Sequence, residues 1–224
     1  MREVVDGVFE VPIGYVNVHL VVTDDGIVLV DTGLPRRSAK IGQALHGLRR
    51  AIGDVHTVLL THYHPDHTGG LAEVRRRSGA RVVAHAADVP YVTGAERPVT
   101  RHPVVKVVSL LMGVPEPAPV DDVVTTDGYA PLPGFTALHT PGHTAGHLSF
   151  LLDRADGVLF AGDAAAGRRG GRIGSAPKMV SADVQQQERS VARLAGLEFE
   201  HAVFGHGRAV RGRAVERFRE YVAR

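Results

Sequence analysis

The 224-residue sequence contains no cysteine. This absence excludes disulfide bonds, thiolate metal ligands and cysteine nucleophiles. The sequence also lacks a large excess of charge of either sign, because 26 basic residues face 24 acidic ones and leave a net charge of +2. That near-balance argues against a general nucleic-acid binder. No stretch approaches the ~20 apolar residues that a membrane-spanning helix requires, so we expect neither nucleic acid nor a membrane as a partner.

What is present suits one globular domain that covers residues 1–224. Hydrophobic residues make up 44% of the chain, which is enough for a packed interior at this length. The first residues, Met1–Asp6, resemble an acid-bearing strand rather than a secretory signal. We therefore expect a cytoplasmic protein.

Strand-like and helix-like segments alternate along the chain without a linker that would mark a second domain. Strands in runs with helices interspersed favour an α/β (α+β) fold, with two sheets packed face to face and covered outside by helices. The strands are expected at Glu3–Val11, Asn17–Thr23, Ile27–Asp31, Val55–Leu60, Arg81–Ala84, Phe135–His139, Gly146–Leu152, Val158–Ala161 and Ala202–Phe204. The helices are expected at Pro35–Ala51, Leu71–Ser78, Asp183–Leu194 and Arg211–Val222.

The most informative segment, HYHPDH, comes soon after the strand-like Val55–Leu60. It places three imidazoles and a carboxylate within six residues, and Zn²⁺ accepts both kinds of ligand. The first two imidazoles are two residues apart on an extended chain and should point the same way. Pro65 then turns the chain, so the carboxylate and the last imidazole face a different direction. One short loop can therefore serve two metal ions, with His62 and His64 on the first and Asp66 and His67 on the second.

Three further ligand-type residues follow strand-like segments downstream, and each lies next to a glycine. They are His143 in TPGHT, Asp163 in GD and His206 in GHG. Glycine permits tight turns and close backbone approach, and strand ends are where α/β proteins gather functional groups. A site for two metal ions needs about three protein ligands per ion, and these residues supply the missing ligands.

With these motifs and the aspartate of VDTG, the chain resembles the metallo-β-lactamase-fold metallohydrolases over essentially its whole length. The resemblance implies a four-layer αββα sandwich of two mixed β-sheets flanked by helices. It also implies that Asp31 orients the ligand loop by hydrogen bonds; capping of the turn after its strand stays open as the alternative. The resemblance assigns His62, His64 and His143 to metal 1, Asp66, His67 and His206 to metal 2, and Asp163 to a bridge between them.

Two such ions, Zn²⁺ first and iron or manganese as alternatives, predict a hydrolase. They can share a bridging water and lower its pKa towards about 7, which provides hydroxide at neutral pH. The charges of Asp66 and Asp163 leave the site net positive, and this favours an anionic tetrahedral transition state. We expect cleavage of an ester, thioester or lactone-type bond of a small-molecule substrate. β-Lactam hydrolysis as a side activity stays open as an alternative.

A different reaction class stays open, because persulfide dioxygenases resemble this pattern but use a single iron. That iron would be held here by His62, His143 and Asp163, and its open coordination positions suit O₂ chemistry. The sequence has no recognisable glutathione-binding signature, which favours the hydrolase.

Features outside the ligand motifs could contact the substrate. The proline-studded Gly94–Asp122 surrounds the apolar Val104–Val114, which predicts a lid over the metals, a homodimer contact through 104–114, or ordinary core packing. Tyr15 could donate a proton to the substrate. Arg168 could meet a carboxylate or phosphate of the substrate, or belong to a solvated basic loop.

Overall fold

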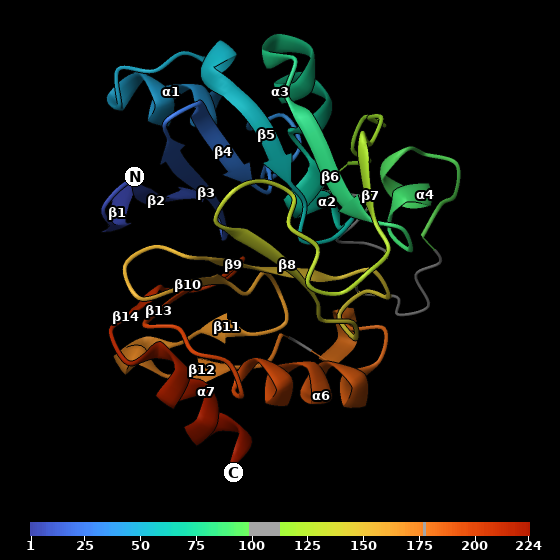
Figure 1. The fold of residues 1–224 in the computed structure, drawn as a ribbon. Helices are drawn as coiled ribbons and strands as arrows, with labels where there is room; N and C mark the ends of the chain where they lie inside the picture. Colours follow the sequence, from blue (N-terminus) through green and yellow to red (C-terminus); the bar gives the residue numbers. More distant parts are fainter. Residues whose placement is uncertain (99–112, 177) are drawn as a thin grey trace. The chain divides into compact units, whose positions relative to one another are not determined.

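The structure is a computed structural model that describes residues 1–98, 113–176 and 178–224 (Figure 1). The chain divides into two compact units, Met1–Val123 and Val124–Arg224. Among the described residues, no helix has both the length and the apolar character needed to cross a membrane. The expectation of a single domain over residues 1–224 stays a prediction.

The first unit is built on a seven-stranded mixed sheet (Figure 1). Its strands are, in spatial order, β1 (Arg2–Val5), β2 (Val8–Ile13), β3 (Val16–Thr23), β4 (Gly26–Val30), β5 (Val55–Leu59), β6 (Arg81–His85) and β7 (Asp122–Val124). Its helices are α1 (Ala39–Gly47), η1 (Ile52–Asp54), α2 (Pro65–Thr68), α3 (Leu71–Ser78) and α4 (Val89–Val92). The strands β1 to β4 pair antiparallel, whereas β4, β5 and β6 pair in parallel because helical crossovers connect them.

One face of this sheet packs against α1 and α3. Alternate strand residues such as Leu20, Leu29 and Val58 share a hydrophobic core with Leu45 of α1 and Val74 of α3. The strand β4 lies in the middle of the sheet and is buried along its whole length. Because β4 and β5 are parallel neighbours, the chain segments that leave their carboxyl ends begin side by side.

The second unit contains a five-stranded mixed sheet and a two-stranded ribbon (Figure 1). The sheet has the order β14 (Val210–Arg211), β13 (His201–Val203), β10 (Val158–Phe160), β9 (Leu148–Leu152) and β8 (Phe135–His139), and the ribbon pairs β11 (Ala166–Gly167) with β12 (Ile173–Gly174). The helices are η2 (Arg169–Gly171), η3 (Lys178–Val180), α6 (Val184–Leu194) and α7 (Ala214–Val222). Leu194 of α6 and Phe218 of α7 share a core with Leu159 and Ala202 of the sheet, so these helices cover one of its faces.

The predicted α/β class, with two mixed sheets and flanking helices, is confirmed. The expected helix Pro35–Ala51 is too long at both ends, because Arg36 and Arg49 have left-handed backbone angles (φ 60° and 57°) that a helix cannot include. The expected first strand is two strands, since the chain turns at Gly7.

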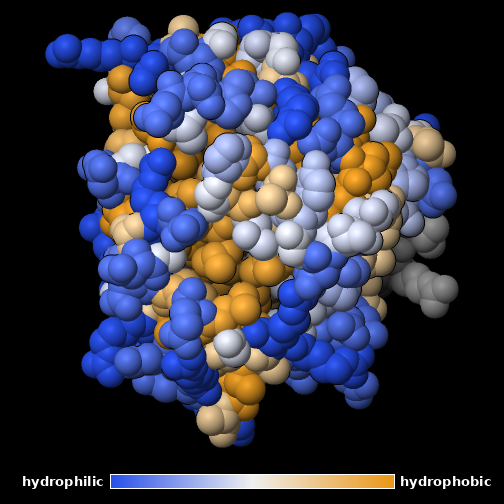
Figure 2. Space-filling model, viewed as in Figure 1, coloured by the Kyte–Doolittle hydropathy of each residue, from blue (hydrophilic) through white to orange (hydrophobic). Residues whose placement is uncertain are grey.

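The apolar segment 104–114, predicted as a lid, a dimer contact or ordinary core packing, lies outside the described residues except for its last two positions. The surface in the space-filling view is mainly hydrophilic, with orange apolar side chains between blue ones (Figure 2). The large hydrophobic side chains exposed among the described residues come from separate parts of the chain: Met1, Tyr15, Val114, Val123, Met179 and Val222.

Candidate metal centre

In the first unit, the loop after β5 carries four of the predicted ligands. Pro65 occupies the first turn of α2, where its missing N–H is not needed, and this ends the extended chain and starts the helix. His62 and His67 are buried, whereas His64 and Asp66 are half-buried. A ligand nitrogen of His62 lies within 4.8 Å of one from His64 and of one from His67, and an oxygen of Asp66 lies equally near His67. The loop therefore gathers its four donors, as the motif predicts.

Asp31 fixes this loop through three hydrogen bonds. It follows β4 with a left-handed backbone (φ 63°) and is 2% exposed. Its Oδ1 accepts from the Thr61 amide at 2.8 Å, and its Oδ2 accepts from the Thr61 hydroxyl at 2.8 Å and from His67 Nδ1 at 2.7 Å. A carboxylate can only accept, so the His67 proton lies on Nδ1 and the Nε2 lone pair can face a metal ion. Asp31 thus contacts the ligand loop at Thr61 and His67, and its orienting role stays a prediction.

The Thr61 hydroxyl fixes the position of the ring proton of His62 in the same way. Because this hydroxyl donates to Asp31, its oxygen accepts from His62 Nδ1, which lies 3.0 Å away. The His67 carbonyl in turn accepts from the Thr32 amide at 2.7 Å and from the Thr32 hydroxyl at 2.9 Å. The segment after β4 and the loop after β5 are thus held together on both sides of the ligands.

Two other buried groups lie beside the loop. Burial and, to a smaller extent, the electrostatic effect of His67 lower the pKa of His19 to about 3, so His19 is neutral at physiological pH. Tyr63 packs against Tyr91, and its amide donates to Asp88 at 3.1 Å. Burial, with the charge of Asp88, raises the pKa of Tyr63 to about 12, so its phenol is not a general base at neutral pH.

In the second unit, three predicted ligands come together at the ends of β8, β10 and β13. One oxygen of Asp163, Oδ2, lies 3.4 Å from His143 Nε2 and 3.2 Å from His206 Nε2. His143 and Asp163 are buried, and His206 is partly exposed. Two imidazole nitrogens and a carboxylate oxygen at such distances surround a point where a divalent cation can bind.

Helix α6 supports this group through Gln187. The amide nitrogen of Gln187 donates to the carbonyls of Asp163 at 2.9 Å and Ala164 at 3.1 Å. Its oxygen accepts from the Ser181 hydroxyl at 2.6 Å, and Ser181 Oγ lies 3.4 Å from His143 Nδ1. One side chain thus reaches the segments that carry two ligands.

A second chain of hydrogen bonds begins at the Asp163 amide, which donates to His147 Nε2 at 2.9 Å. His147 Nδ1 lies 2.9 Å from Thr140 Oγ1, and Thr140 Oγ1 lies 2.9 Å from Ser149 Oγ. Ser149 donates to the Ala161 carbonyl at 3.2 Å, which fixes the direction of every bond in the chain. His147 is therefore a neutral structural partner of the Asp163 loop.

The residues expected to contact substrate lie near the surface. Tyr15 is 55% exposed in the turn between β2 and β3. The exposed Arg168 donates to the carbonyl of Ser175, which folds its guanidinium back over the β11–β12 ribbon. The Gly167 amide donates to the His206 carbonyl at 3.0 Å, so the backbone before Arg168 is fixed to a ligand residue.

Sequence reasoning missed Thr61, Ser181 and Gln187, the hydrogen-bond partners of ligand residues or of their loops. The position of Thr61 directly before the ligand motif was an available signal. Gln187 is the last of three consecutive glutamines, and nothing in the sequence distinguishes the buried one except its place on the apolar face of α6.

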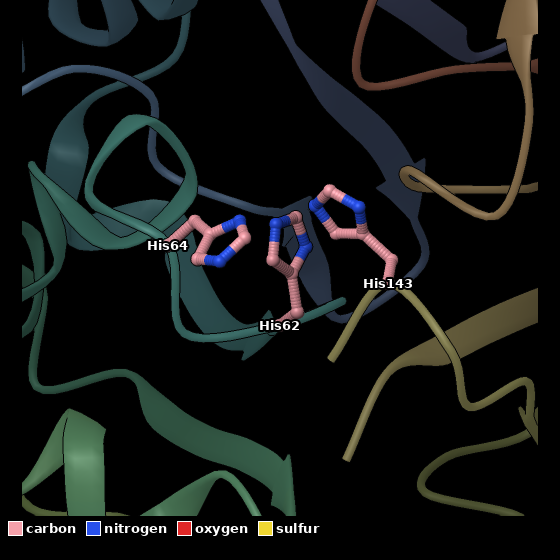
Figure 3. Close-up of side chains that lie close together, drawn as sticks. All are labelled: His62, His64 and His143. Carbon is pink, nitrogen blue, oxygen red and sulfur yellow. The ribbon is translucent and has the colours of Figure 1, made fainter. Parts of the chain in front are cut away.

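The donors fit divalent metal ions. Figure 3 draws the imidazoles of His62 and His64, which leave the loop after β5, and the imidazole of His143, which leaves the loop after β8. Histidine nitrogen and carboxylate oxygen suit Zn²⁺, and the fixed Nδ1 positions leave Nε2 for coordination. Fold and donors together define an α/β protein equipped for metal-dependent chemistry.

Comparison with known proteins agrees with that class. The model of the metallo-beta-lactamase superfamily matches residues 11–206. The chain is 30% identical over 212 residues to "Probable metallo-hydrolase YflN" of Bacillus subtilis (strain 168), covering 83% of this chain and 77% of that protein. It is 29% identical over 166 residues to the hydroxyacylglutathione hydrolase of Shewanella pealeana, covering 72% of this chain but only 48% of that enzyme.

Solved structures give the same result. A metallo-beta-lactamase mutant from Cronobacter sakazakii aligns with a TM-score of 0.73 at 26% identity, covering 92% of this chain and 79% of that one. A metallo-beta-lactamase family protein from Thermus thermophilus aligns with a TM-score of 0.72 at 27% identity, covering 99% and 80%. The chain belongs to the metallo-β-lactamase superfamily and is a hydrolase of that superfamily, whose members use divalent metal ions.

Proposed function

We propose that this hydrolase binds two divalent metal ions and cleaves an ester, thioester or lactone bond of a small molecule. The observation that carries the proposal is the complete set of donors. Four lie together on the loop after β5, and in the second unit Asp163 Oδ2 lies close to the Nε2 atoms of His143 and His206. Family membership supports the assignment of His62, His64 and His143 to one ion, Asp66, His67 and His206 to the other, and Asp163 to both.

The two ions, when bound, would activate water at neutral pH and polarise the scissile carbonyl. The chain's own residues fix where this happens. Asp31 and Thr61 hold the imidazoles of His67 and His62 by their Nδ1 atoms, which leaves both Nε2 atoms for coordination. The carboxylates Asp66 and Asp163 neutralise only part of the charge of two divalent cations, so an anionic tetrahedral transition state is favoured.

A thioester is the first substrate class to test. Several relatives are named hydroxyacylglutathione hydrolases, and hydroxyacylglutathione is a thioester. The chain spans about half the length of these relatives, so the glutathione part of their substrate is not carried over. Arg168 supports an anionic group on the substrate, because it is exposed and its backbone is fixed beside His206. Tyr15 is a weaker candidate contact.

The proposal is tested by metal content together with hydrolysis. Elemental mass spectrometry on protein purified without chelator should give about two zinc, iron or manganese ions per chain. The same preparation should hydrolyse members of a panel of thioesters, lactones, 4-nitrophenyl esters and β-lactams. His206→Ala should lose metal and activity, whereas His46→Ala, on the exposed side of α1, should keep both.

Other outcomes would redirect or refute the proposal. About one iron per chain, with O₂ consumption in the presence of a thiol persulfide and no hydrolysis, would favour the dioxygenase. Protein that takes up no metal on reconstitution would contradict the ligand assignment itself.

A further inference from the structure

The side chain of Gln187 lies in the second unit between the two loops that carry His143 and Asp163. It is 2% exposed, although glutamine is usually a surface residue. Its three hydrogen bonds, two from the amide nitrogen and one to the amide oxygen, leave little of its polar capacity unused. A buried amide satisfied in this way has one orientation only.

That orientation determines the hydrogen positions as far as His143. The amide nitrogen faces two carbonyl oxygens, which can only accept, so the amide oxygen must be the atom that faces Ser181. Ser181 therefore donates its hydroxyl hydrogen to Gln187, and its oxygen can only accept from His143 Nδ1. The proton of neutral His143 then lies on Nδ1, and the Nε2 lone pair points toward the Asp163 side.

The backbone around Gln187 reinforces this arrangement. The amides of Asp183 and Ala182 donate to the carbonyls of Gly142 at 2.8 Å and His143 at 3.1 Å. Gly142 has a φ of +130°, and a Cβ there would lie 2.2 Å from the backbone nitrogen of Gln187. Ser190, one turn further along α6, donates to the Pro141 carbonyl at 2.7 Å. The residues just before α6 and the first turns of the helix are thus hydrogen-bonded to the loop that carries His143.

We propose that Gln187 is a positioning residue for the metal centre, holding the His143 imidazole in its metal-binding tautomer and the Asp163 loop at a fixed distance from it. This inference rests on the proposed function, because it assumes that both residues bind metal. Groups that orient metal ligands in this way typically contribute 10- to 100-fold to metal affinity.

The test compares Gln187→Glu, Gln187→Leu and a control, Gln185→Glu. The glutamate has the shape of glutamine but no hydrogen to donate, so it faces the Asp163 and Ala164 carbonyls with an oxygen. The leucine removes every hydrogen bond. Gln185 lies two residues away on the same helix and is exposed, so Gln185→Glu controls for the added charge.

Two measurements are made on the metal-loaded proteins. Competition with a chromophoric chelator gives the Zn²⁺ dissociation constants, and visible absorption of the Co²⁺-loaded proteins reports ligand geometry. We expect at least one ion to bind about 10- to 100-fold more weakly in both Gln187 variants, with an altered Co²⁺ spectrum. A purely structural role would lower the melting temperature and leave the Co²⁺ spectrum unchanged.

Ser181→Ala keeps the proposal testable if the Gln187 variants do not fold. It keeps the hydrogen bonds from Gln187 to the Asp163 and Ala164 carbonyls, and it removes the acceptor for His143 Nδ1 together with the donor to the Gln187 oxygen. Long-range ¹H–¹⁵N spectra should place the His143 proton on Nδ1 in the wild type, and a mixture of tautomers should appear in Ser181→Ala.

The proposed function and the positioning role of Gln187 would be contradicted by different results. Wild-type protein that binds no metal contradicts the proposed function. Wild-type protein that binds metal, while the Gln187 variants keep its affinity within about twofold and its Co²⁺ spectrum, overturns the positioning role alone.

Discussion

Replacing Asp31 by asparagine should weaken metal binding through His67 without removing any metal ligand. Asparagine has nearly the shape of aspartate and tolerates the left-handed backbone at this position (φ 63°). The change therefore isolates the exchange of one carboxylate oxygen for an NH₂ group. Alanine would in addition strain the backbone and leave a cavity.

Asp31 accepts hydrogen bonds from three donors, and no orientation of the new amide can accept all three. If its oxygen keeps the Thr61 amide, its nitrogen faces the Thr61 hydroxyl and His67 Nδ1. His67 must then accept at Nδ1 and carry its proton on Nε2, which is the atom intended for the metal. If the amide turns over, its nitrogen opposes the Thr61 N–H. Either arrangement leaves the wrong group opposite a buried donor.

The magnitudes follow from these contacts. Hydrogen bonds to a charged acceptor contribute about 1.5–3 kcal/mol each, and the first orientation loses two of the three bonds whereas the second loses one, so we expect the metal-free protein to lose about 1.5–6 kcal/mol of unfolding free energy. Misplacing the His67 proton should reduce the affinity for the metal that it binds by about 10- to 100-fold, equivalent to about 1.4–2.8 kcal/mol.

The assay is competition for Zn²⁺ against a chromophoric chelator, with urea unfolding on metal-free samples. Asp24→Asn, in the exposed turn between β3 and β4, is the matched control and should change neither quantity. Zn²⁺ affinity of Asp31→Asn within about twofold of the wild type would refute the orienting role and favour simple capping of the turn after β4.

Three further predictions concern stability. Gly69→Ala would place a Cβ 2.1 Å from the Pro35 nitrogen and should lower the free energy of unfolding in urea by about 3 kcal/mol. Gly53→Ala, which has open space around the new Cβ, should lower it by under about 1 kcal/mol. Equal losses in the two variants would show that the close approach of Gly69 to Pro35 is not what requires glycine. Burial raises the pKa of Asp121. The hydrogen bond from the Val82 backbone amide and the contact with Arg75 lower it more, so the pKa lies below its usual 3.8. This carboxylate therefore stabilises the fold at neutral pH and loses that effect as pH falls below 3.8 and through its lowered pKa. Asp121→Asn should flatten the acid limb of the unfolding free energy, and an unchanged limb would refute the assignment. Chelation of bound metal should lower the melting temperature, and added Zn²⁺ should restore it; a melting temperature that ignores both would argue against a folded-state metal site.

The candidate ligand residues could be recognised in the sequence because their signal is local. HYHPDH, TPGHT and GHG each follow a strand-like segment, and a strand end is a defined place in an α/β fold. The boundaries of α1 could not be predicted in the same way. The helical pattern of Pro35–Ala51 continues past the points where Arg36 and Arg49 adopt left-handed angles, and no glycine or asparagine marks those points.

The supporting residues were harder to predict because their signal is not local. Gln187 lies 44 positions after His143 and 24 after Asp163 in the sequence, and its role depends on which face of α6 is buried. Three consecutive glutamines have the same propensity for helix and the same side-chain chemistry. The buried face of α6 on which the third lies, and the packing of Gly142 against its backbone, distinguish it from the first two.

Three candidate ligand histidines share the same hydrogen-bond arrangement at Nδ1. His62, His67 and His143 each have Nδ1 within 2.7–3.4 Å of an oxygen that can only accept: the Thr61 hydroxyl, the Asp31 carboxylate and the Ser181 hydroxyl. In each case the acceptor's own hydrogen, where it has one, is already donated elsewhere. The tautomer needed for coordination through Nε2 is therefore built into the hydrogen-bond network of the protein before a metal ion arrives. A chain that had kept the histidines but lost this network would have to reorganise three imidazoles on binding, which is why we expect the supporting residues to set metal affinity.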